Sequence, residues 1–178
     1  MYKGAQKNEN KGQPGVGNRV VKQMSAVIKN PENHILHHDN FFTDCKLLEE
    51  LAAKGQRAIG TARTNRTEKC PLNVTKKDER GKMDYRSNGN ILFAQWKDNA
   101  VVTIGTNYGS VFPVKKVSRW VKGKGKTAVD MPALVDDYNK GMGGVDIIYG
   151  RWSRHHGSTA RSIQTRTWRK EVVVATVH

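Results

Sequence analysis

The chain has 178 residues, of which 37% are hydrophobic, so we expect a folded domain with one core and room for a smaller lobe. Lys and Arg number 31 against 16 Asp and Glu, giving a net charge of +15 at pH 7. This excess indicates a polyanionic partner, chiefly nucleic acid, bound through its phosphates. No stretch has the length of a membrane span, and the start MYKGAQKNENK lacks the apolar core of a signal peptide, which argues against membrane and secreted proteins.

The N-terminal part of the sequence predicts an arm and a helix. Residues 1–17 are polar and glycine-rich, which is typical of a flexible arm. A helix is predicted over 18–30, with Asn18 as its N-cap and Asn30-Pro31 at its end, because apolar residues recur there at helical spacing. These residues are Val20, Val21, Met24, Val27 and Ile28.

A strand–helix–strand unit is predicted over residues 34–63. Alternation in the first strand, 34–38, places Ile35, His37 and Asp39 on one side and Leu36 and His38 on the other. Thr43 is the expected N-cap of the helix, Asp44 suits its first turn, and Gly55 stands where a helix commonly ends. The segment 57–63 is the second strand, and such a crossover implies a parallel pair.

After residue 63 the pattern becomes antiparallel. A charged loop precedes three predicted strands joined by Asn88-Gly89 and Asp98-Asn99 turns, a meander that interrupts the α/β core and is open to interpretation as a separate small lobe. The strands are MDYRS, NILFAQWKD and AVVTIGTNY. A helix is predicted from Met131 through residue 142, and helical periodicity returns only at 168–177.

Basic residues gather in segments 115–126 and 151–170, which we interpret as DNA-contacting. Trp120 or Trp152 is available there to stack on unpaired bases. A solvated charged surface is the alternative interpretation. The candidate nucleic-acid-binding residues are Lys115, Lys116, Arg119, Lys122, Lys124, Lys126, Arg151 and Arg154.

Two glycine-rich segments do not meet the requirements of nucleotide-binding motifs. KGKGKT, 122–127, has Trp120 where a phosphate-binding loop needs glycine, so a flexible basic loop is predicted. GMGGVD, 141–146, follows a helix rather than a strand, and we expect a tight turn that delivers Asp146 to a site.

Asp39 is the main candidate for chemistry, since ligands bind at the C-terminal ends of strands in α/β sheets. A role in capping the next helix, or in accepting hydrogen bonds from loop amides, is equally compatible with its position. The acids available to join it are Asp136, Asp137 and Asp146, and two converging aspartates would suit Mg²⁺. A metal site that uses both His37 and His38 is disfavoured, because adjacent strand residues face opposite ways.

Four blocks, in order, resemble the piggyBac transposase family. They are HDNFFTD (38–44), GTARTNR (60–66), GNILFAQWKDNAVVTIGTNY (89–108) and DYNKGMGGVD (137–146). The resemblance implies an α/β fold with an RNase H-like core, lacking its first strands, in residues 18–64 and 131–178. It implies a β-rich basic insertion over 65–130. It also implies three catalytic aspartates that bind two Mg²⁺ ions, of which Asp39 matches the second and Asp146 the third.

The family's metals activate water and then a 3′-hydroxyl for in-line attack on phosphodiesters, and its elements insert at TTAA. The first aspartate is expected upstream of Met1, and Tyr149 stands where a further acid is common, so these residues are expected to be catalytically incomplete. The alternatives are a non-catalytic DNA-binding module, domesticated or decayed, and a product with no selected role. The resemblance further implies DNA as partner, a homodimer, no membrane or small-molecule substrate, and nuclear localisation.

Overall fold

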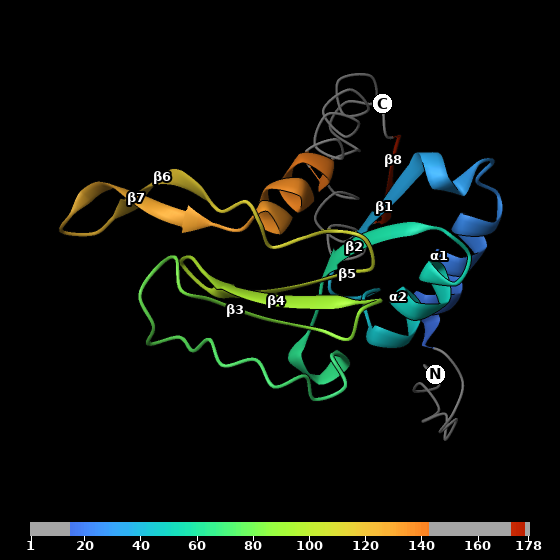
Figure 1. Cartoon of the computed structure of the whole chain (residues 1–178), viewed down its shortest axis with the longest axis horizontal. Helices are drawn as coiled ribbons and strands as arrows, with labels where there is room; N and C mark the ends of the chain where they lie inside the picture. Colours follow the sequence, from blue (N-terminus) through green and yellow to red (C-terminus); the bar gives the residue numbers. More distant parts are fainter. Residues whose placement is uncertain (1–14, 143–171, 177–178) are drawn as a thin grey trace, which may run out of the picture.

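Six strands form one mixed sheet in the computed structural model, which describes residues 15–142 and 172–176 (Figure 1). The strand order is β3-β4-β5-β2-β1-β8, and a separate hairpin pairs β6 with β7. The sheet strands are β1 His34–His38, β2 Arg57–Thr61, β3 Met83–Ser87, β4 Leu92–Lys97, β5 Val101–Thr106 and β8 Val172–Thr176. The hairpin strands are β6 Lys115–Val121 and β7 Gly125–Met131. The described helices are α1 Val16–Ala26, α2 Cys45–Ala52, the 3-10 turns η1 Pro31–Asn33 and η2 Thr64–Arg66, and a helix that begins at residue 133.

The predicted crossover is confirmed, because β1 and β2 pair in parallel with His37 opposite Ile59. The predicted cap is wrong by one residue: Asp44 is the N-cap of α2, and its carboxylate accepts a hydrogen bond from Leu47 N at 2.8 Å. Thr43 instead donates its hydroxyl proton to the carbonyl of Asp39. Gly55 follows the helix with a φ of +68°, the left-handed conformation that favours glycine at such an end.

Helix α1 begins at Val16, inside the segment predicted as an arm, and Gly15 rather than Asn18 is its N-cap. Asn18 is buried, and its amide nitrogen donates to Asp44 Oδ1 at 3.3 Å, so it ties the two helices together instead of capping one. The predicted apolar face is only partly used. Val21 is fully buried whereas Val27 is 81% exposed.

Each face of the sheet carries its own hydrophobic core. Helices α1 and α2 cover one face, where the largest buried side chains are Leu36, Phe42, Leu47, Leu48, Leu51 and Phe93. The hairpin and the helix from residue 133 cover the other face, whose core includes Ile59, Trp96, Ile104, Val129, Met131 and Leu134. The alternation predicted for β1 is confirmed, since Leu36 belongs to the first core and Ile35 packs against the second.

The three predicted meander strands are present as β3, β4 and β5, but they do not form a separate lobe. Strand β5 pairs antiparallel with β2, with Gly60 opposite Gly105, so the meander extends the same sheet. Trp96 of β4 also shares its core with Leu134 of the following helix. A continuous ladder and a shared core therefore join segments that the sequence pattern alone separates.

The C-terminal part of the described chain departs from prediction in two respects. The helix predicted after Met131 is observed over residues 133–142, while Met131 itself ends β7. Residues Val172–Thr176 form β8, antiparallel to β1, where helical periodicity had been expected. Four of these five residues are β-branched, which favours a strand. No helix of the described residues is long and apolar enough to cross a membrane.

Candidate functional site

Asp39 follows the last residue of β1 and is half-buried. Its Oδ1 accepts a hydrogen bond from Phe41 N at 2.8 Å, and its carbonyl accepts the backbone N–H of Phe42 and of Thr43, each at 3.2 Å. The side chain of Phe42 is buried in the core below this turn. The turn that follows β1 is therefore fixed at both its backbone and its apolar anchor, and it holds Asp39 at the edge of the sheet.

The surroundings of Asp39 have opposing effects on the pKa of its carboxyl group. Burial raises its pKa above the ordinary value, because desolvation disfavours the charged form. The amides of Phe41 and Phe42 and the guanidinium groups of Arg63 and Arg66 oppose that effect. A carboxylate oxygen is a ligand that hard divalent ions prefer, while Arg63 and Arg66 already compensate part of the Asp39 charge.

Arg63 and Arg66 are site residues that the sequence reasoning did not single out. Arg63 is exposed and its Nε donates to Asn40 Oδ1 at 3.2 Å. Arg66 donates to the carbonyl of Phe41, and its guanidinium lies 5.9 Å from the centroid of the Phe41 ring. Both follow β2, and the C-terminal ends of parallel strands meet at one sheet edge, so the parallel pair was the signal that could have found them.

The two histidines of β1 face opposite sides of the sheet, as predicted. His38 is fully buried on the α2 side, and its Nδ1 lies 2.7 Å from Thr43 Oγ1. Because the Thr43 proton goes to the Asp39 carbonyl at 2.9 Å, His38 Nδ1 is the donor in that bond. His38 Nε2 has no hydrogen-bond partner among the described residues. His38 is thus a buried structural histidine, and burial lowers its pKa to about 3.

His37 marks the place where the helix from residue 133 crosses β1. A Cβ built on Gly141 would lie 2.0 Å from atoms of the His37 ring, so the helix backbone rests directly on that ring. Burial lowers the pKa of His37, and the charge of Asp137 on the same helix opposes the shift. The close packing brings the chain that leads toward residue 146 to the strand that ends at Asp39.

The predicted acids are only partly placed. Asp146 lies outside the described residues, and no group of three metal-ligating side chains occurs within those that are described. Asp136 is paired with Lys115 Nζ at 2.7 Å and with Lys140 Nζ at 2.9 Å. That double pairing makes Asp136 a structural residue. Asp137 lies 3.9 Å from Lys140 Nζ and its charge acts on His37, so Asp39 and Asp137 are the described candidate carboxylates without a close ion pair.

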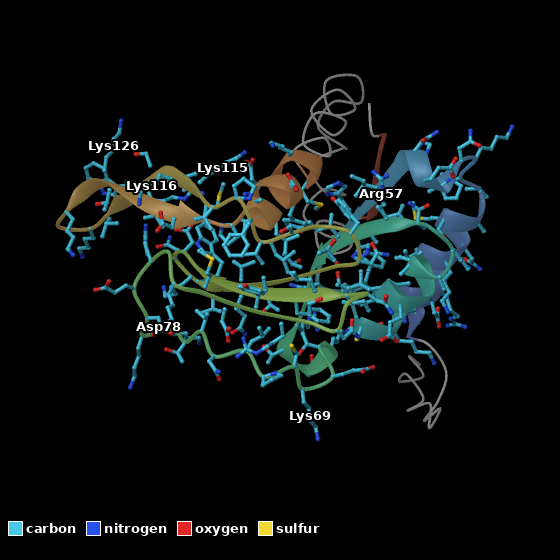
Figure 2. The ribbon with its side chains drawn as sticks, in the orientation of Figure 1. Arg57, Lys69, Asp78, Lys115, Lys116 and Lys126 are labelled. Atoms are coloured by element: carbon cyan, nitrogen blue, oxygen red, sulfur yellow. The ribbon has the colours of Figure 1, made fainter. Side chains whose placement is uncertain are left out.

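Half of the predicted DNA-binding residues in the β6–β7 hairpin have acidic partners. Lys115 pairs with Asp136, Lys116 Nζ lies 2.8 Å from Asp130, and Arg119 Nε donates to Asp98 Oδ2 at 3.2 Å. Figure 2 shows Lys115 near the base of the hairpin, with Lys116 further along it. Lys115 and Arg119 therefore help to attach the hairpin to the rest of the fold, whereas the Lys116–Asp130 pair joins the two strands of the hairpin to each other.

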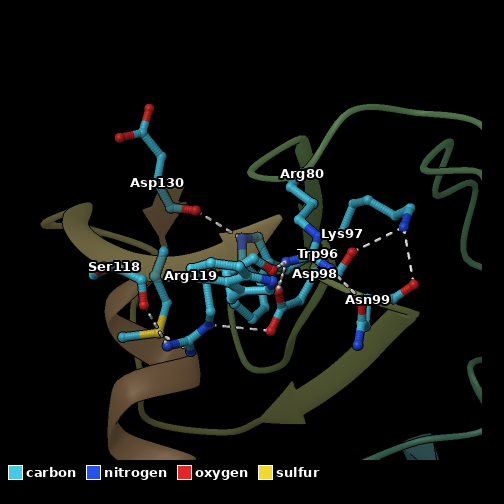
Figure 3. Close-up of polar contacts among 10 residues, drawn as sticks. Arg80, Trp96, Lys97, Asp98, Asn99, Ser118, Arg119 and Asp130 are labelled. Carbon is cyan, nitrogen blue, oxygen red and sulfur yellow. Dashed lines mark hydrogen bonds and ion pairs between the residues drawn. The ribbon is translucent and has the colours of Figure 1, made fainter. Parts of the chain in front are cut away.

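A polar network fixes the inner side of the hairpin against β4 (Figure 3). Trp96 Nε1 donates to the carbonyl of Asp130 at 2.7 Å, and the Arg119 guanidinium lies 6.0 Å from the centroid of a Trp96 ring. Arg80 Nη1 donates to the carbonyl of Trp120 at 2.9 Å. The hairpin therefore contacts the rest of the fold at several points along its length, in addition to the chain connections at its two ends.

The other predicted hairpin cations lie at its tip. Lys122, Lys124 and Lys126 are exposed, and no ion pair of the described residues involves them. Gly123 and Gly125 take φ values of +81° and +71°, so the segment predicted as a flexible basic loop is instead the turn of a β-hairpin. Figure 2 shows Lys126 pointing away from the molecule. Arg151 and Arg154 lie outside the described residues.

Comparison with known proteins identifies the class of protein. A family model described as Transposase IS4 matches residues 1–178. The fold resembles that of a piggyBac transposase, solved by cryo-electron microscopy as a synaptic complex with hairpin DNA, with a TM-score of 0.56 at 20% identity. The match covers 83% of this chain and 29% of that one. These residues are therefore part of a transposase fold.

Curated human relatives define the family more closely. PiggyBac transposable element-derived protein 3 from Homo sapiens is 37% identical over 153 residues, covering 82% of this chain and 26% of that protein. PiggyBac transposable element-derived protein 2, also human, is 36% identical over 138 residues, covering 72% of this chain and 23% of that protein. The chain belongs to the piggyBac transposase family, and it spans about a quarter of the length of these relatives.

Proposed function

We propose that this transposase-derived domain binds DNA through the tip of the β6–β7 hairpin. The observation that carries the proposal is the set of three exposed lysines at the tip, Lys122, Lys124 and Lys126, which have no acidic partner among the described residues. The solved piggyBac transposase that resembles this fold was captured with hairpin DNA, which supports a DNA partner.

The hairpin has the charge and the shape for this role. Residues 115–126 hold six basic side chains and no acid, and three of the six have acidic partners in ion pairs. The remaining three lie in the turn and at the start of β7, where they would neutralise neighbouring phosphates and release counterions. A two-stranded β-ribbon also has dimensions that fit the major groove of B-DNA.

Replacing the three tip lysines together, as K122A/K124A/K126A, should weaken DNA binding at least about tenfold at low salt, which equals about 1.4 kcal/mol. The slope of log K against log salt should fall by up to about 0.9 for each lost phosphate contact. Fluorescence anisotropy with a labelled duplex across a salt series measures both quantities.

The matched control is K29A/K46A/K54A, which removes the same charge from exposed lysines of α1, α2 and the segments that follow them. If net charge alone attracts DNA, the two triple variants will lose equal affinity and equal salt slope. That equality would refute a hairpin contact, whereas a loss confined to the tip variant supports it.

A second candidate function, metal-dependent phosphodiester chemistry in an RNase H-like core, is favoured by the geometry at the end of β1. Gly141 rests on the His37 ring, and Asp39 stands two residues beyond His37. Asp146 follows Gly141 by five residues, a length of chain that reaches at most about 18 Å. We therefore propose that Asp39 and Asp146 share a divalent ion at this edge of the sheet, as the family resemblance implies.

The residues around that edge have distinct roles in this proposal. Asp39 and Asp146 would hold Mg²⁺, which when bound lowers the pKa of a coordinated water and stabilises charge on phosphate oxygens. Phe41 N orients the Asp39 carboxylate by its hydrogen bond, and the exposed Arg63 is placed to contact a phosphate beside it. With two of the three family aspartates matched, we propose that these 178 residues alone bind DNA without cleaving it.

The family resemblance supports three further proposals, which concern the partners, the localisation and the domain boundaries of the chain. The expected partners are transposon ends or TTAA targets, a second copy of the chain, and no membrane or small molecule. Nuclear localisation is proposed because DNA is the expected partner and the chain carries a net charge of +15. By resemblance, residues 18–64 and 131–178 correspond to the transposase core and residues 65–130 to an insertion. In this fold one sheet joins the strands of the insertion to those of the core.

A further inference from the structure

The two faces of the β6–β7 hairpin differ in what their side chains contact. The strand register pairs Val117 with Val129 and Arg119 with Thr127, and this inner face packs on the second core. The outer face pairs Lys116 with Asp130, Ser118 with Ala128, and Trp120 with Lys126. All of these outer side chains except Asp130 are exposed, so the outer face is a solvent-facing strip.

Trp120 is the unusual member of that strip. Its side chain is 70% exposed, whereas Trp96 of β4 is 4% exposed and donates its indole N–H to the carbonyl of Asp130. The neighbours of Trp120 on the outer face are a serine, an alanine and a lysine. Small or cationic neighbours leave the flat face of the indole uncovered, although burial of an aromatic ring is strongly favourable.

The backbone under Trp120 is held firmly while its side chain is not. The carbonyl of Trp120 accepts a hydrogen bond from Arg80, and the adjacent Arg119 is anchored to Asp98. These contacts fix the backbone of the strand that carries Trp120. A stacking platform needs such a support, because a ring on a mobile loop would lose more conformational entropy on binding.

Charge complementarity indicates what would cover the ring. Lys126 is directly cross-strand from Trp120, a pairing that places Cβ atoms about 5 Å apart, and Lys122 and Lys124 follow in the turn. Proteins that bind single-stranded nucleic acid combine cations that contact the phosphates with aromatic faces on which bases stack, and the outer face of the hairpin has both.

We propose that Trp120 stacks on an unpaired base, so that the outer face of the hairpin prefers DNA with unpaired or single-stranded segments over intact duplex. The inference rests on the proposed DNA-binding function and deepens it, because the lysines supply affinity for any DNA and Trp120 supplies the preference. An intact duplex keeps its bases stacked on one another and offers no free face to the indole.

The test measures affinities of the full chain for a labelled oligo(dT) strand and for a duplex of equal length, using wild type, W120A and W120F. Stacking of one base is worth about 1–3 kcal/mol, so W120A should weaken binding to the single strand by about 5- to 150-fold. Duplex affinity should change by less than about twofold, because phosphate contacts are kept. W120F should recover most of the loss, since phenylalanine retains a ring.

K122A/K124A/K126A serves as the comparison that separates the two proposals. It should weaken both DNA forms and leave the ratio between single strand and duplex nearly unchanged. If W120A leaves that ratio unchanged while the lysine variant weakens binding, the stacking inference is wrong and the proposed function stands. If wild type binds neither DNA, the proposed function fails, and the inference fails with it.

Discussion

Gly60→Ala should destabilise the fold by about 4 kcal/mol, the sum of an overpacking cost and a broken buried hydrogen bond. A Cβ at residue 60 would lie 2.2 Å from His38 Nδ1, 2.3 Å from Thr43 Oγ1 and 2.5 Å from the His38 carbonyl. None of these atoms is the end of a flexible surface side chain. The clash would separate the His38–Thr43 pair that fixes the turn at Asp39.

Urea unfolding followed by circular dichroism measures this loss. Gly15→Ala is the matched control, because it is the same change at a position where the new Cβ meets nothing within 4 Å. The control should cost about 1 kcal/mol or less, as expected for a poorer helix cap. A free energy of unfolding for G60A within about 1 kcal/mol of wild type would contradict the packing described around β1 and β2.

Acidification should remove stability through His38. Burial lowers its pKa from 6.5 to about 3 in the folded state. Between these two pH values the unfolded chain binds a proton at this residue and the folded chain does not, so the free energy of unfolding falls as pH falls. The contribution is about 1.4 kcal/mol per pH unit, or about 5 kcal/mol over the whole interval. The lowered pKa of His37 acts in the same direction, and the raised pKa of Asp39 opposes it.

The difference in unfolding free energy between wild type and H38Q isolates the His38 contribution. Glutamine keeps an amide donor for Thr43 Oγ1 and does not titrate, so the variant should lose this part of the pH dependence. Urea titrations at a series of pH values from about 7 to 4 provide the comparison. A wild-type-to-variant difference that stays constant over that range would show that His38 is not buried as described.

Local sequence signals predicted most of the sheet. The alternation in HILHH, the parallel pair it forms with β2, and the Asn88-Gly89 and Asp98-Asn99 turns all depend on neighbours in the chain. The N-cap of α2 was misplaced by one residue because Thr43 and Asp44 are both good caps. Tertiary contacts determine which of the two caps the helix. The Thr43 hydroxyl is hydrogen-bonded to His38, whereas the Asp44 carboxylate accepts a hydrogen bond from Asn18 as well as from the helix.

Long-range pairing could not be predicted from the sequence. Nothing local to β5 indicates that it pairs with β2, which made the meander open to interpretation as a separate lobe. The sequence also does not predict which basic residues of the hairpin form ion pairs and which have no such partner within the described part of the chain. Lys115 and Arg119 have acidic partners at Asp136 and Asp98, distant in sequence, while the charge pattern of residues 115–126 is uniform. Only the fold distinguishes the anchoring cations from the three at the tip.

Asp39 and Asp146 are proposed to share one divalent ion, and the candidate site depends on this claim. Titration of the isotope-labelled chain with Mn²⁺, observed by NMR, tests it most directly, because a paramagnetic ion broadens the signals of nearby nuclei. The amides of Phe41 and Gly141 should broaden in wild type, and either D39N or D146N should abolish the effect. Broadening that persists unchanged in D146N, or that lies away from the end of β1, would contradict a shared site.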